Sequence, residues 1–316
     1  MKKILVIRFS SLGDVVLITG VIRLFSKFNN DIEVDVLTYE EYKDVFTDNI
    51  HIKHLLVINR SLPFFTYLKS LIKITQPYDY IIDLQKNMKT FILKFIRYGS
   101  YYTFNKLSLE RRLYVYFKWR SKKLNTHITE RYLQAFSKVR KLYYNSIEEL
   151  RPEIYANSGE YIRKRIIVHP FASKKTKEWP YFYELIKRLV NNSFDVVVVG
   201  KGKGGLLGGG RTLVNRTTLK ELINEIKKGD IIITTDSGPM HLAVALNKTV
   251  IAIFGSTTKE MGFYPVFKNT YVFENANLSC RPCHVHGKSR CPKGHFKCMR
   301  DVDLEVVMNF LSTIVS

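Results

Sequence analysis

Short apolar runs and longer amphipathic segments alternate along the chain. The first half contains four runs rich in β-branched and aliphatic residues, namely KILVIRF, IEVDVLTY, IKHLLVIN and YDYIIDLQ. Between them, segments such as VVLITGVIRLFSKF and LPFFTYLKSLIKI space their apolar residues three or four positions apart, as helices do. This alternation predicts βαβ units, and therefore a parallel sheet covered by helices on both faces.

The same alternation of apolar runs and amphipathic segments starts again after Pro152 and the polar segment from Tyr155 to Tyr161. The later apolar runs are RIIVHPF, DVVVVG, DIIITTDS and TVIAIFGS, again separated by segments with helical spacing. We therefore predict an α/β protein of two Rossmann-like, doubly wound parallel-sheet domains, residues 1–155 and 156–316. A length of 316 residues agrees with two domains. The closing helix, around Leu304 to Ile314, is expected to pack back on the first domain.

The apolar runs and the net charge limit the classes of protein to which the chain can belong. The first run stops at Arg8, too early for a signal peptide, and no window approaches the roughly 18 apolar residues of a membrane span. These features predict a cytoplasmic location. The chain has 50 Lys and Arg against 28 Asp and Glu, a net charge of +22. Such a charge indicates an anionic partner: nucleic acid, an acidic membrane surface or a phosphorylated substrate. A generally basic, solvated surface is the alternative.

The segment from Lys86 to Arg140 mixes basic and aromatic residues most densely. A surface of this kind suits anionic lipid headgroups. Its leading basic residues are Lys86, Lys89, Lys94, Arg97, Lys106, Arg111, Arg112, Lys118, Arg120, Lys122 and Lys123.

A Ser-Ser-Leu-Gly turn ends the first predicted strand and places Asp14 at the start of the following helix. In open α/β sheets such turns line the ligand crevice. An acidic residue also stabilises a helix N-terminus without any further role, and this is the alternative. Gly13 beside Asp14 permits a tight turn and the close approach of a ligand, which favours a functional carboxylate.

Two segments of the second half are suited to phosphate. The segment from Thr234 to Leu246 is again strand, polar turn and helix, so the hydroxyl of Ser237 and the free N–H groups of the helix start can cradle a pyrophosphate. His241 in that helix is either a core histidine or a neighbour of the phosphate. The loop HPFASKKTKEWP after an earlier strand contains Ser173 and Lys177 and adds positive charge, unless its lysines are simply solvated.

The glycine-rich segment from Gly200 to Gly210 contains a formal G-x-G-x-x-G match at Gly200, Gly202 and Gly205. Further glycines follow where the fingerprint requires a helix, so we interpret the segment as a loop that contacts the nucleoside.

All four cysteines lie in one short segment. Their spacing suits a structural, tetrahedral zinc site, which would leave no open position for metal catalysis. Reduced or paired cysteines that brace a loop are the alternative. The four are Cys280, Cys283, Cys291 and Cys298.

A resemblance to a known family is carried by six stretches of the sequence, in order: SSLGDVVLITGVIR, YDYIIDLQ, HPFASKKTKEWP, TTDSGPMHLAVAL, IAIFGST, and CRPC with CPKGHFKCM. In these stretches the chain resembles the ADP-heptose:lipopolysaccharide heptosyltransferases, glycosyltransferase family nine. The resemblance spans nearly the whole chain. It implies a GT-B fold, in which two Rossmann-like domains face a cleft, the first holding the acceptor and the second the nucleotide sugar.

The resemblance also assigns roles to residues. Asp14 matches the family's catalytic base, and Lys177 matches a lysine near the donor phosphates. The donor set is Ser173, Lys177, Ser237, Gly238, Met240 and His241, and the acceptor set is Arg60, Gln85 and Lys89. Relatives often have an acidic residue after the second strand of the nucleotide domain, whereas this chain has Lys and Gly there.

The resemblance therefore implies an inverting transfer of a heptose-type sugar from a nucleotide diphosphate, expected to be ADP-heptose, to the anionic lipopolysaccharide core. No catalytic cofactor is expected, because a lysine and helix dipoles can stabilise the leaving diphosphate. The enzyme should lie at the inner face of the cytoplasmic membrane. Three alternatives remain. The first is a glycosyltransferase of the same family that uses another sugar or acceptor. The others are a basic nucleic-acid-binding protein, although no recognised nucleic-acid motif is present, and a nicotinamide-dependent oxidoreductase.

Overall fold

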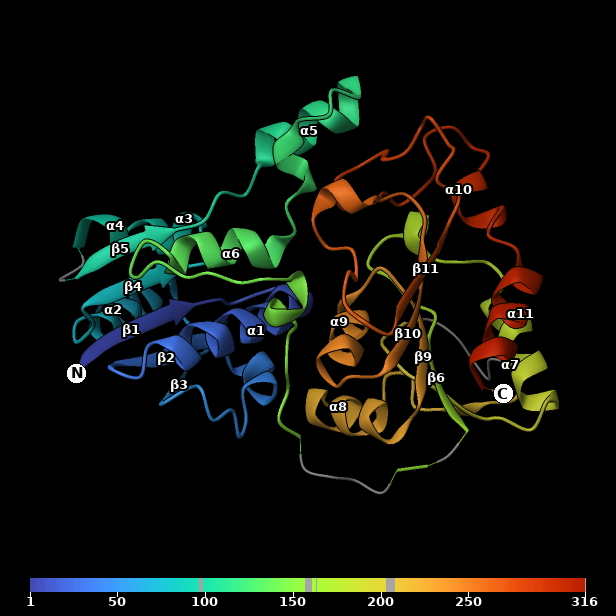
Figure 1. The fold of residues 1–316 in the computed structure, drawn as a ribbon, viewed down its shortest axis with the longest axis horizontal. Helices are drawn as coiled ribbons and strands as arrows, with labels where there is room; N and C mark the ends of the chain where they lie inside the picture. The colour runs from blue at the N-terminus through green and yellow to red at the C-terminus, as the bar shows by residue number, and fades with distance from the viewer. Residues whose placement is uncertain (97–98, 157–160, 163, 203–207, 316) are drawn as a thin grey trace. The chain divides into compact units, whose positions relative to one another are not determined.

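The computed structural model describes residues 1–96, 99–156, 161–162, 164–202 and 208–315. The chain forms two compact units (Figure 1). The first unit contains Met1–Lys106 and Ile128–Tyr155, and the second contains Leu107–His127 and Ala156–Ser316. The segment 107–127, which the sequence-based division assigned to the first domain, is therefore grouped with the second unit. The predicted division of acceptor and donor binding between the two domains stays a prediction.

The first unit is built on a five-stranded parallel sheet with strand order β3-β2-β1-β4-β5. Its elements are β1 (Lys2–Ile7), α1 (Leu12–Phe28), β2 (Ile32–Tyr39), η1 (Glu40–Val45), β3 (Leu55–Ile58), α2 (Phe64–Thr75), β4 (Tyr80–Asp83), α3 (Met88–Phe91), α4 (Leu93–Ile96), β5 (Ser100–Thr103), α6 (Ile128–Phe136) and η3 (Ile147–Leu150). The central strand β1 is buried from Ile4 to Ile7, so both of its faces are covered, as in doubly wound sheets.

The second unit is built on a six-stranded parallel sheet with order β11-β10-β9-β6-β7-β8. Its elements are α5 (Ser108–Phe117), η2 (Lys122–Asn125), β6 (Arg165–His169), η4 (Lys175–Lys177), α7 (Phe182–Asn191), β7 (Asp195–Val198), β8 (Arg211–Thr212), α8 (Leu219–Lys228), β9 (Ile231–Thr235), α9 (Gly238–Ala245), β10 (Thr249–Phe254), η5 (Lys259–Met261), β11 (Thr270–Glu274), α10 (Lys297–Arg300) and α11 (Leu304–Val315).

Local sequence explains the helices of the second unit. Helix α7 buries Phe182, Leu185, Ile186 and Leu189, a set spaced for one helical face, against the sheet. The last helix, α11, contributes Leu304, Val307 and Leu311 to this same core. Its packing on the first domain stays a prediction.

Segment 107–127 is held to the second unit by polar contacts. The Arg120 guanidinium lies 3.0 Å from the buried Glu260 carboxylate. Lys118 Nζ donates to the carbonyl oxygen of Pro282 at 2.8 Å, and His127 Nε2 lies 3.1 Å from the carbonyl oxygen of Tyr264. These contacts explain why a segment from the middle of the first half is grouped with the second unit.

The α/β class with two parallel sheets is confirmed. Counted from the first strand of each unit, both sheets have the Rossmann order 3-2-1-4-5, and the second unit adds a sixth strand. In such sheets ligands bind at the carboxyl ends of the strands where the order reverses, here between β1 and β4 and between β6 and β9. Among the helices described, none is both long and apolar enough to span a membrane.

Candidate active site

In the first unit, the reversal point of the sheet is occupied by Asp14 and Gln85. Ile7 at the end of β1 is paired with Asp83 at the end of β4. The turn after β1 leads into α1, whose first turn contains Asp14. Gln85 directly follows β4, and its Oε1 accepts the backbone N–H groups of Phe9 at 3.0 Å and Ser10 at 3.1 Å. Gln85 thus fixes the turn that presents Asp14.

Asp14 is surrounded by donors. Tyr132 from α6 donates its hydroxyl to Asp14 Oδ1 at 2.7 Å. The other carboxylate oxygen, Oδ2, accepts the Ser11 hydroxyl at 2.9 Å and its backbone N–H at 3.3 Å. An Arg8 guanidinium nitrogen lies 2.8 Å from the same Oδ2. The Asp14 side chain retains 12% exposure. It therefore stabilises the helix start and remains accessible to a ligand.

These contacts set the charge of the carboxylate. Burial acts to raise the pKa of Asp14, but the positive charge of Arg8 and the hydroxyl of Tyr132 outweigh it. The net pKa of Asp14 lies below its ordinary value. Asp14 is therefore ionised at neutral pH and can accept a proton, although an acid with a low pKa is a weaker base than one near neutrality.

The three predicted acceptor residues gather around Phe9, next to the Asp14 turn. The ring of Phe9 stacks on Tyr39 at 4.7 Å, and the guanidinium of Arg60 lies 5.9 Å from the Tyr39 ring centroid. On another side, Phe9 meets the edge of Tyr67 at 6.2 Å, and Lys89 Nζ lies 4.6 Å from that ring centroid. Arg60 is exposed, with an ion-pair contact of 3.6 Å to Glu41. Aromatic rings thus hold both cations near the carboxyl edge of the sheet.

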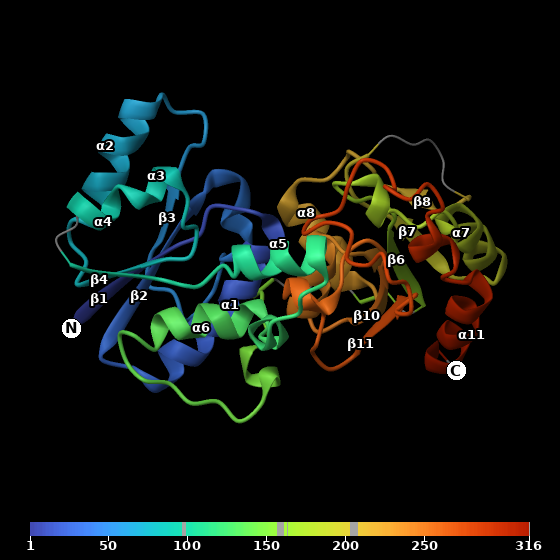
Figure 2. The ribbon, with the colours of Figure 1, turned by 90° about the horizontal axis from the view of Figure 1, so that it is seen from above.

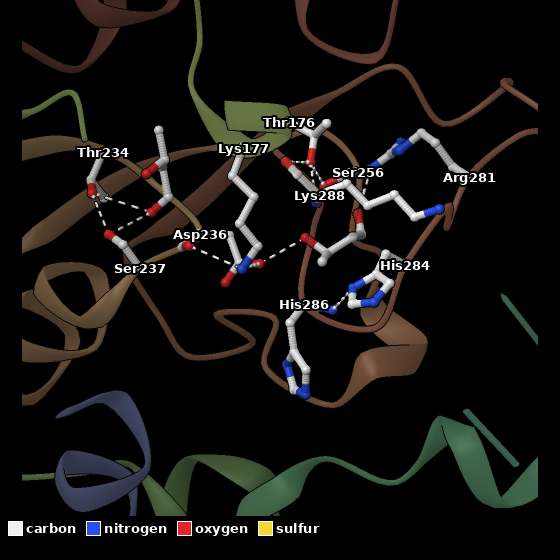
Figure 3. Close-up of polar contacts among 12 residues, drawn as sticks. Thr176, Lys177, Thr234, Asp236, Ser237, Ser256, Arg281, His284, His286 and Lys288 are labelled. Carbon is white, nitrogen blue, oxygen red and sulfur yellow. Dashed lines mark hydrogen bonds and ion pairs between the residues drawn. The ribbon is translucent and has the colours of Figure 1, made fainter. Parts of the chain in front are cut away.

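In the second unit, the reversal point is formed by the turns after β6 and β9. His169 and Thr234 are paired across these strands. The turn after β9 contains Asp236 and Ser237 and leads into α9, and the loop after β6 contains Lys177. Sequence segments that lie about 60 positions apart are therefore neighbours, as Figure 3 shows.

The Lys177–Asp236 ion pair lies at the centre of this arrangement (Figure 3). Lys177 Nζ is 2.6 Å from Asp236 Oδ2 and 3.3 Å from the Asp236 carbonyl oxygen. Thr257 donates its hydroxyl to Asp236 Oδ2 at 2.7 Å. Burial acts to raise the pKa of Asp236, but the Lys177 ammonium and Thr257 hold it below its ordinary value. The Lys177 ammonium thus makes both of these contacts with Asp236, and an ammonium has three N–H donors.

Ser237 and its neighbours shape the start of α9. The Ser237 hydroxyl donates to the carbonyl oxygen of Thr235 at 3.1 Å and lies 3.2 Å from His169 Nδ1. Burial lowers the pKa of His169 to about 4, so this imidazole is neutral at physiological pH. Gly238 is the first residue of α9, and its small size leaves the helix N-terminus open to an anion. Met240 and His241 are buried in the helix, and the charge of His241 also lowers the pKa of Asp236.

The segment 284–288 packs against the lysine loop. The Thr176 hydroxyl donates to the Ser256 hydroxyl at 3.0 Å and accepts the Lys288 N–H at 2.7 Å. Gly287 has a φ of +83°, and a Cβ there would lie 3.2 Å from Lys177 Cγ, so the segment passes close to the ion pair. Ser173 is exposed at the start of the same loop. Figure 3 shows His284 on the side of the ion pair toward this segment, whereas the Lys288 side chain extends away from Lys177.

The glycine-rich loop is described only in part, because Gly205 of the formal fingerprint lies outside the described residues. Gly200 has a φ of +121°, and a Cβ there would lie 2.6 Å from the His169 ring. Asn215 closes the start of the loop by bonding both the N–H and the carbonyl oxygen of Gly202, at 3.1 and 2.8 Å. Gly200 is therefore required by close packing on His169.

The four cysteines lie near one another, because Cys280, Cys283 and Cys291 all act on the pKa of Cys298. All four are free, and across the described ranges no three His, Cys, Asp or Glu side chains come together as ligands. Cys280 Sγ lies 3.9 Å from His295 Nε2, and burial raises the pKa of Cys298 to about 12, which keeps it a thiol. The zinc site predicted from the cysteine spacing stays a prediction. The loop is also held by the buried Arg281, which donates to the Thr257 carbonyl oxygen at 2.9 Å.

Comparison with known proteins shows the family of the chain. Residues 68–293 match the family model described as glycosyltransferase family 9 (heptosyltransferase). The chain belongs to glycosyltransferase family 9. This glycosyltransferase is 27% identical over 304 residues to lipopolysaccharide heptosyltransferase 1 of Campylobacter coli, covering 85% of this chain and 86% of the relative. It is also 37% identical over 105 residues to lipooligosaccharide heptosyltransferase 2 of Campylobacter jejuni, covering 31% of this chain and 30% of that relative.

Solved structures share the fold. The E. coli ADP-heptose lps heptosyltransferase II matches the glycosyltransferase with a TM-score of 0.72 at 19% identity, covering all of this chain and 98% of that one. The E. coli heptosyltransferase WaaC with ADP has a TM-score of 0.70 at 17% identity, covering 98% of this chain and 99% of that one.

Several residues of the candidate site were not singled out from the sequence. Arg8 stands at the end of the first apolar run, where a charged residue at the carboxyl end of a buried strand could have indicated a role. Tyr132 gave no such signal, because its contact with Asp14 joins positions 118 residues apart. Asp236 lay inside a recognised motif of the glycosyltransferase, but its pairing with Lys177 required the fold.

Proposed function

We propose that this glycosyltransferase moves a heptose-type sugar, with inversion, from ADP-heptose to the inner core of lipopolysaccharide. The observation that carries the proposal is the match over 85% of the chain to a lipopolysaccharide heptosyltransferase. Two E. coli heptosyltransferase structures of the same fold contain ADP and ADP-2-deoxy-2-fluoro heptose. Their donor supports a nucleotide-sugar site at the α9 turn of this chain.

In the proposed reaction, Asp14 Oδ1 takes the proton of the acceptor hydroxyl as that oxygen attacks the anomeric carbon of the donor. A carboxylate offers about four acceptor positions, two on each oxygen. Oδ2 is crowded by Ser11 and Arg8, whereas Oδ1 accepts one hydrogen bond from the described residues, from the Tyr132 hydroxyl. Oδ1 therefore has room for the acceptor hydroxyl, and Tyr132 and Arg8 hold the carboxylate in position.

The bond between the anomeric carbon and the diphosphate oxygen breaks in the same step, and negative charge develops on the leaving ADP. The free N–H groups at the Gly238 end of α9 and the remaining N–H of Lys177 are suited to that charge. Because Asp236 already balances Lys177, the diphosphate must share the ammonium with the carboxylate. His284 lies near the pair and is proposed to supply an additional donor (Figure 3).

Replacement of Asp14 by Asn tests the base. The amide keeps the shape of the side chain but cannot accept the proton, so kcat should fall about 100-fold to 10,000-fold. ADP binding, measured by calorimetry, should be unchanged. Asp48→Asn is the matched control, since Asp48 is exposed in the same unit at a φ of +57° that Asn tolerates. Wild-type turnover in the Asp14 variant would refute the assigned role.

The donor and acceptor are tested together. The purified enzyme is incubated with ADP-heptose and with other nucleotide sugars, using deep-truncated lipopolysaccharide as the acceptor, and the products are weighed by mass spectrometry. We expect one added heptose with ADP-heptose. Efficient transfer of a different sugar, or no transfer to the truncated core, would contradict the heptose assignment.

The acceptor is a lipid-linked, anionic saccharide, and the chain has a net charge of +22. We therefore propose that the enzyme works at an anionic membrane surface and binds it peripherally. Attraction between exposed basic residues and anionic headgroups is weakened by salt, so the binding should be salt-sensitive.

A further inference from the structure

Helices α2, α3 and α4 of the first unit expose large apolar side chains to solvent. Phe65, Met88 and Phe95 are 77%, 92% and 70% exposed, values that are unusual for residues of this size. Phe64 and Phe91 are exposed as well. We call these five residues the apolar face.

The five residues belong to one surface. On their inner sides the helices share a single core, to which α2 contributes Tyr67 and Leu71, and to which Leu93 belongs at the start of α4. Lys89 Nζ lies 4.6 Å from the Tyr67 ring centroid, which joins α3 to α2. Figure 2 shows the three helices together along one side of the first unit. The ring centroids of Phe64 and Phe65 lie 5.6 Å apart and those of Phe91 and Phe95 5.4 Å apart. Exposed apolar side chains grouped on neighbouring helices are typical of an interaction site.

The stretch of sequence that contains the apolar face is mostly basic. Between Arg60 and Leu109 the sequence contains only two acidic residues, Asp79 and Asp83, and Asp83 is fully buried. Eight basic residues fall in the same interval: Arg60, Lys69, Lys73, Lys86, Lys89, Lys94, Arg97 and Lys106. Lys69 and Lys73 on α2 and Lys94 on α4 are exposed. An apolar patch bordered by lysines complements a surface that is apolar inside and anionic outside.

The apolar face also adjoins the acceptor side of the candidate active site. Phe64 and Phe65 begin α2, which follows the carboxyl end of β3, and Met88 begins α3, which follows the carboxyl end of β4. Asp14 follows the carboxyl end of β1 in the same parallel sheet. The starts of these helices therefore share one edge of the sheet with Asp14.

A second basic and aromatic element, the α5 segment, is less suited to this role. Tyr116, Phe117 and Trp119 are exposed there. However, Arg120 is paired with Glu260, and Lys118 donates to backbone carbonyl oxygens of the second unit. Part of its positive charge is thus already used within the protein.

We propose that the apolar face is the surface by which the enzyme docks on an anionic phospholipid bilayer. The phenylalanines and Met88 enter the boundary between headgroups and acyl chains, and Lys69, Lys73 and Lys94 contact the phosphates. Docking by this edge brings a lipid-linked acceptor to the side of the sheet where Asp14 lies. The inference rests on the proposed membrane-bound acceptor and names the residues that meet the membrane.

Vesicle sedimentation tests the docking surface. The full-length protein is mixed with vesicles of phosphatidylcholine and phosphatidylglycerol, or of phosphatidylcholine alone, at low and high salt. The wild type should bind the anionic vesicles at low salt. A triple variant, Phe65→Ser, Phe91→Ser and Phe95→Ser, should bind them about tenfold more weakly or worse. The matched control, Tyr116→Ser, Phe117→Ser and Trp119→Ser, should bind within about twofold of the wild type.

The lysines are tested separately. Each basic residue near an anionic surface strengthens binding by about fivefold, so Lys69→Glu with Lys73→Glu should weaken binding at low salt and have little effect at high salt. The exposed positions of all these changes keep the core intact. As a check on folding, every variant should transfer sugar to a lipid-free core oligosaccharide at the wild-type rate.

The outcomes separate the docking surface from the transfer reaction. Unchanged vesicle binding by the phenylalanine variant overturns the docking surface, whatever sugar the enzyme transfers. If the wild type self-associates on gel filtration and this variant does not, with equal vesicle binding, the face meets a second copy and the proposal is again wrong. Binding that depends on the phenylalanines, in an enzyme that transfers no heptose, would keep the docking surface and refute the proposed donor.

Discussion

Asp14 combines a structural and a chemical role in one side chain. Its carboxylate accepts the Ser11 N–H at the start of α1, as an acidic residue in a first helical turn often does. The same carboxylate is aligned by Tyr132 and Arg8, which a helix start alone does not require. The two interpretations of this residue are therefore compatible, and the surrounding donors favour a functional carboxylate.

Arg8 should control the pH dependence of the reaction. Asp14 must be ionised to accept a proton, and Arg8 helps to hold its pKa below the ordinary value. In Arg8→Met the positive charge is lost while burial remains, so the pKa of Asp14 rises. The acidic limb of the profile of kcat/KM against pH should then move to higher pH. Arg8→Lys, which retains the charge, should move it less, and identical limbs in Arg8→Met and the wild type would contradict this role.

At the level of single residues, the sequence indicated the candidate motifs but not which of their residues contact each other. Asp14, Lys177 and Ser237 each stand in a strand-to-helix turn or a loop after a strand, and such positions can be recognised locally. The ion pair of Lys177 with Asp236 depends on the sheet order that brings β6 beside β9. The zinc site that the cysteine spacing predicts stays a prediction, since across the described residues the four thiols are free and no three ligands are already gathered.

At the scale of elements, Gly20 shows how α1 is packed. A Cβ at this position would lie 2.3 Å from the Leu150 carbonyl oxygen and 2.4 Å from that of Arg151, both rigid backbone atoms at the end of η3. The Arg23 guanidinium of the same helix donates to the Arg151 carbonyl oxygen at 3.2 Å. The helix and η3 can approach this closely only with glycine at the contact.

Gly20→Ala should therefore destabilise the protein. Alanine usually stabilises a helix by about 1 kcal/mol relative to glycine, but the clash should cost about 1–3 kcal/mol more than that gain. The free energy of unfolding in urea measures the effect. Ser26→Ala in the same helix serves as a control that leaves this contact alone. A Gly20→Ala variant more stable than the wild type would show that η3 moves away easily.

The elements themselves were largely predictable. Most of the apolar runs form buried parallel strands, because a strand covered on both faces has few polar positions, whereas β3 at the sheet edge is only partly buried. The pattern could not show that 107–127 leaves the first unit, because that segment is held by Arg120, Lys118 and His127, whose partners lie far along the chain. An amphipathic pattern shows which side of a helix is buried, not what covers it.

For the whole molecule, binding of the donor nucleotide should raise the stability of the folded protein. A ligand that binds only the folded state, present at 100 times its Kd, stabilises by about 2.7 kcal/mol. ADP should therefore raise Tm, and NAD should raise it less if the site is built for a nucleotide sugar. The double variant Lys177→Met with Asp236→Asn removes the ion pair without leaving a buried charge, and it should lose much of the ADP effect. Lys175→Met in the same loop should keep it, and an equal ADP effect in the double variant would argue against Lys177 as a phosphate contact.

The structure shows where exposed basic residues of the molecule lie. The sequence placed the basic and aromatic residues between Lys86 and Arg140. In the fold, part of this stretch is paired within the second unit, while α2 to α4 combine exposed lysines with exposed phenylalanines. Composition indicates that an anionic partner exists, and only the exposure of individual side chains indicates where it binds.

Residues 107–127 belong to the second unit, although the residues on both sides of them belong to the first. This arrangement affects how the chain folds during synthesis on the ribosome. Arg120 is made 140 residues before its partner Glu260. At roughly 5–20 residues per second, the segment waits about 7–28 seconds for the chain that will hold it. During that time the first unit can complete its sheet and add α6, while the basic, aromatic loop stays uncovered. A fragment cut after Tyr155 would retain the same unpartnered loop permanently, so the two halves of the enzyme cannot be separated cleanly by a single cut.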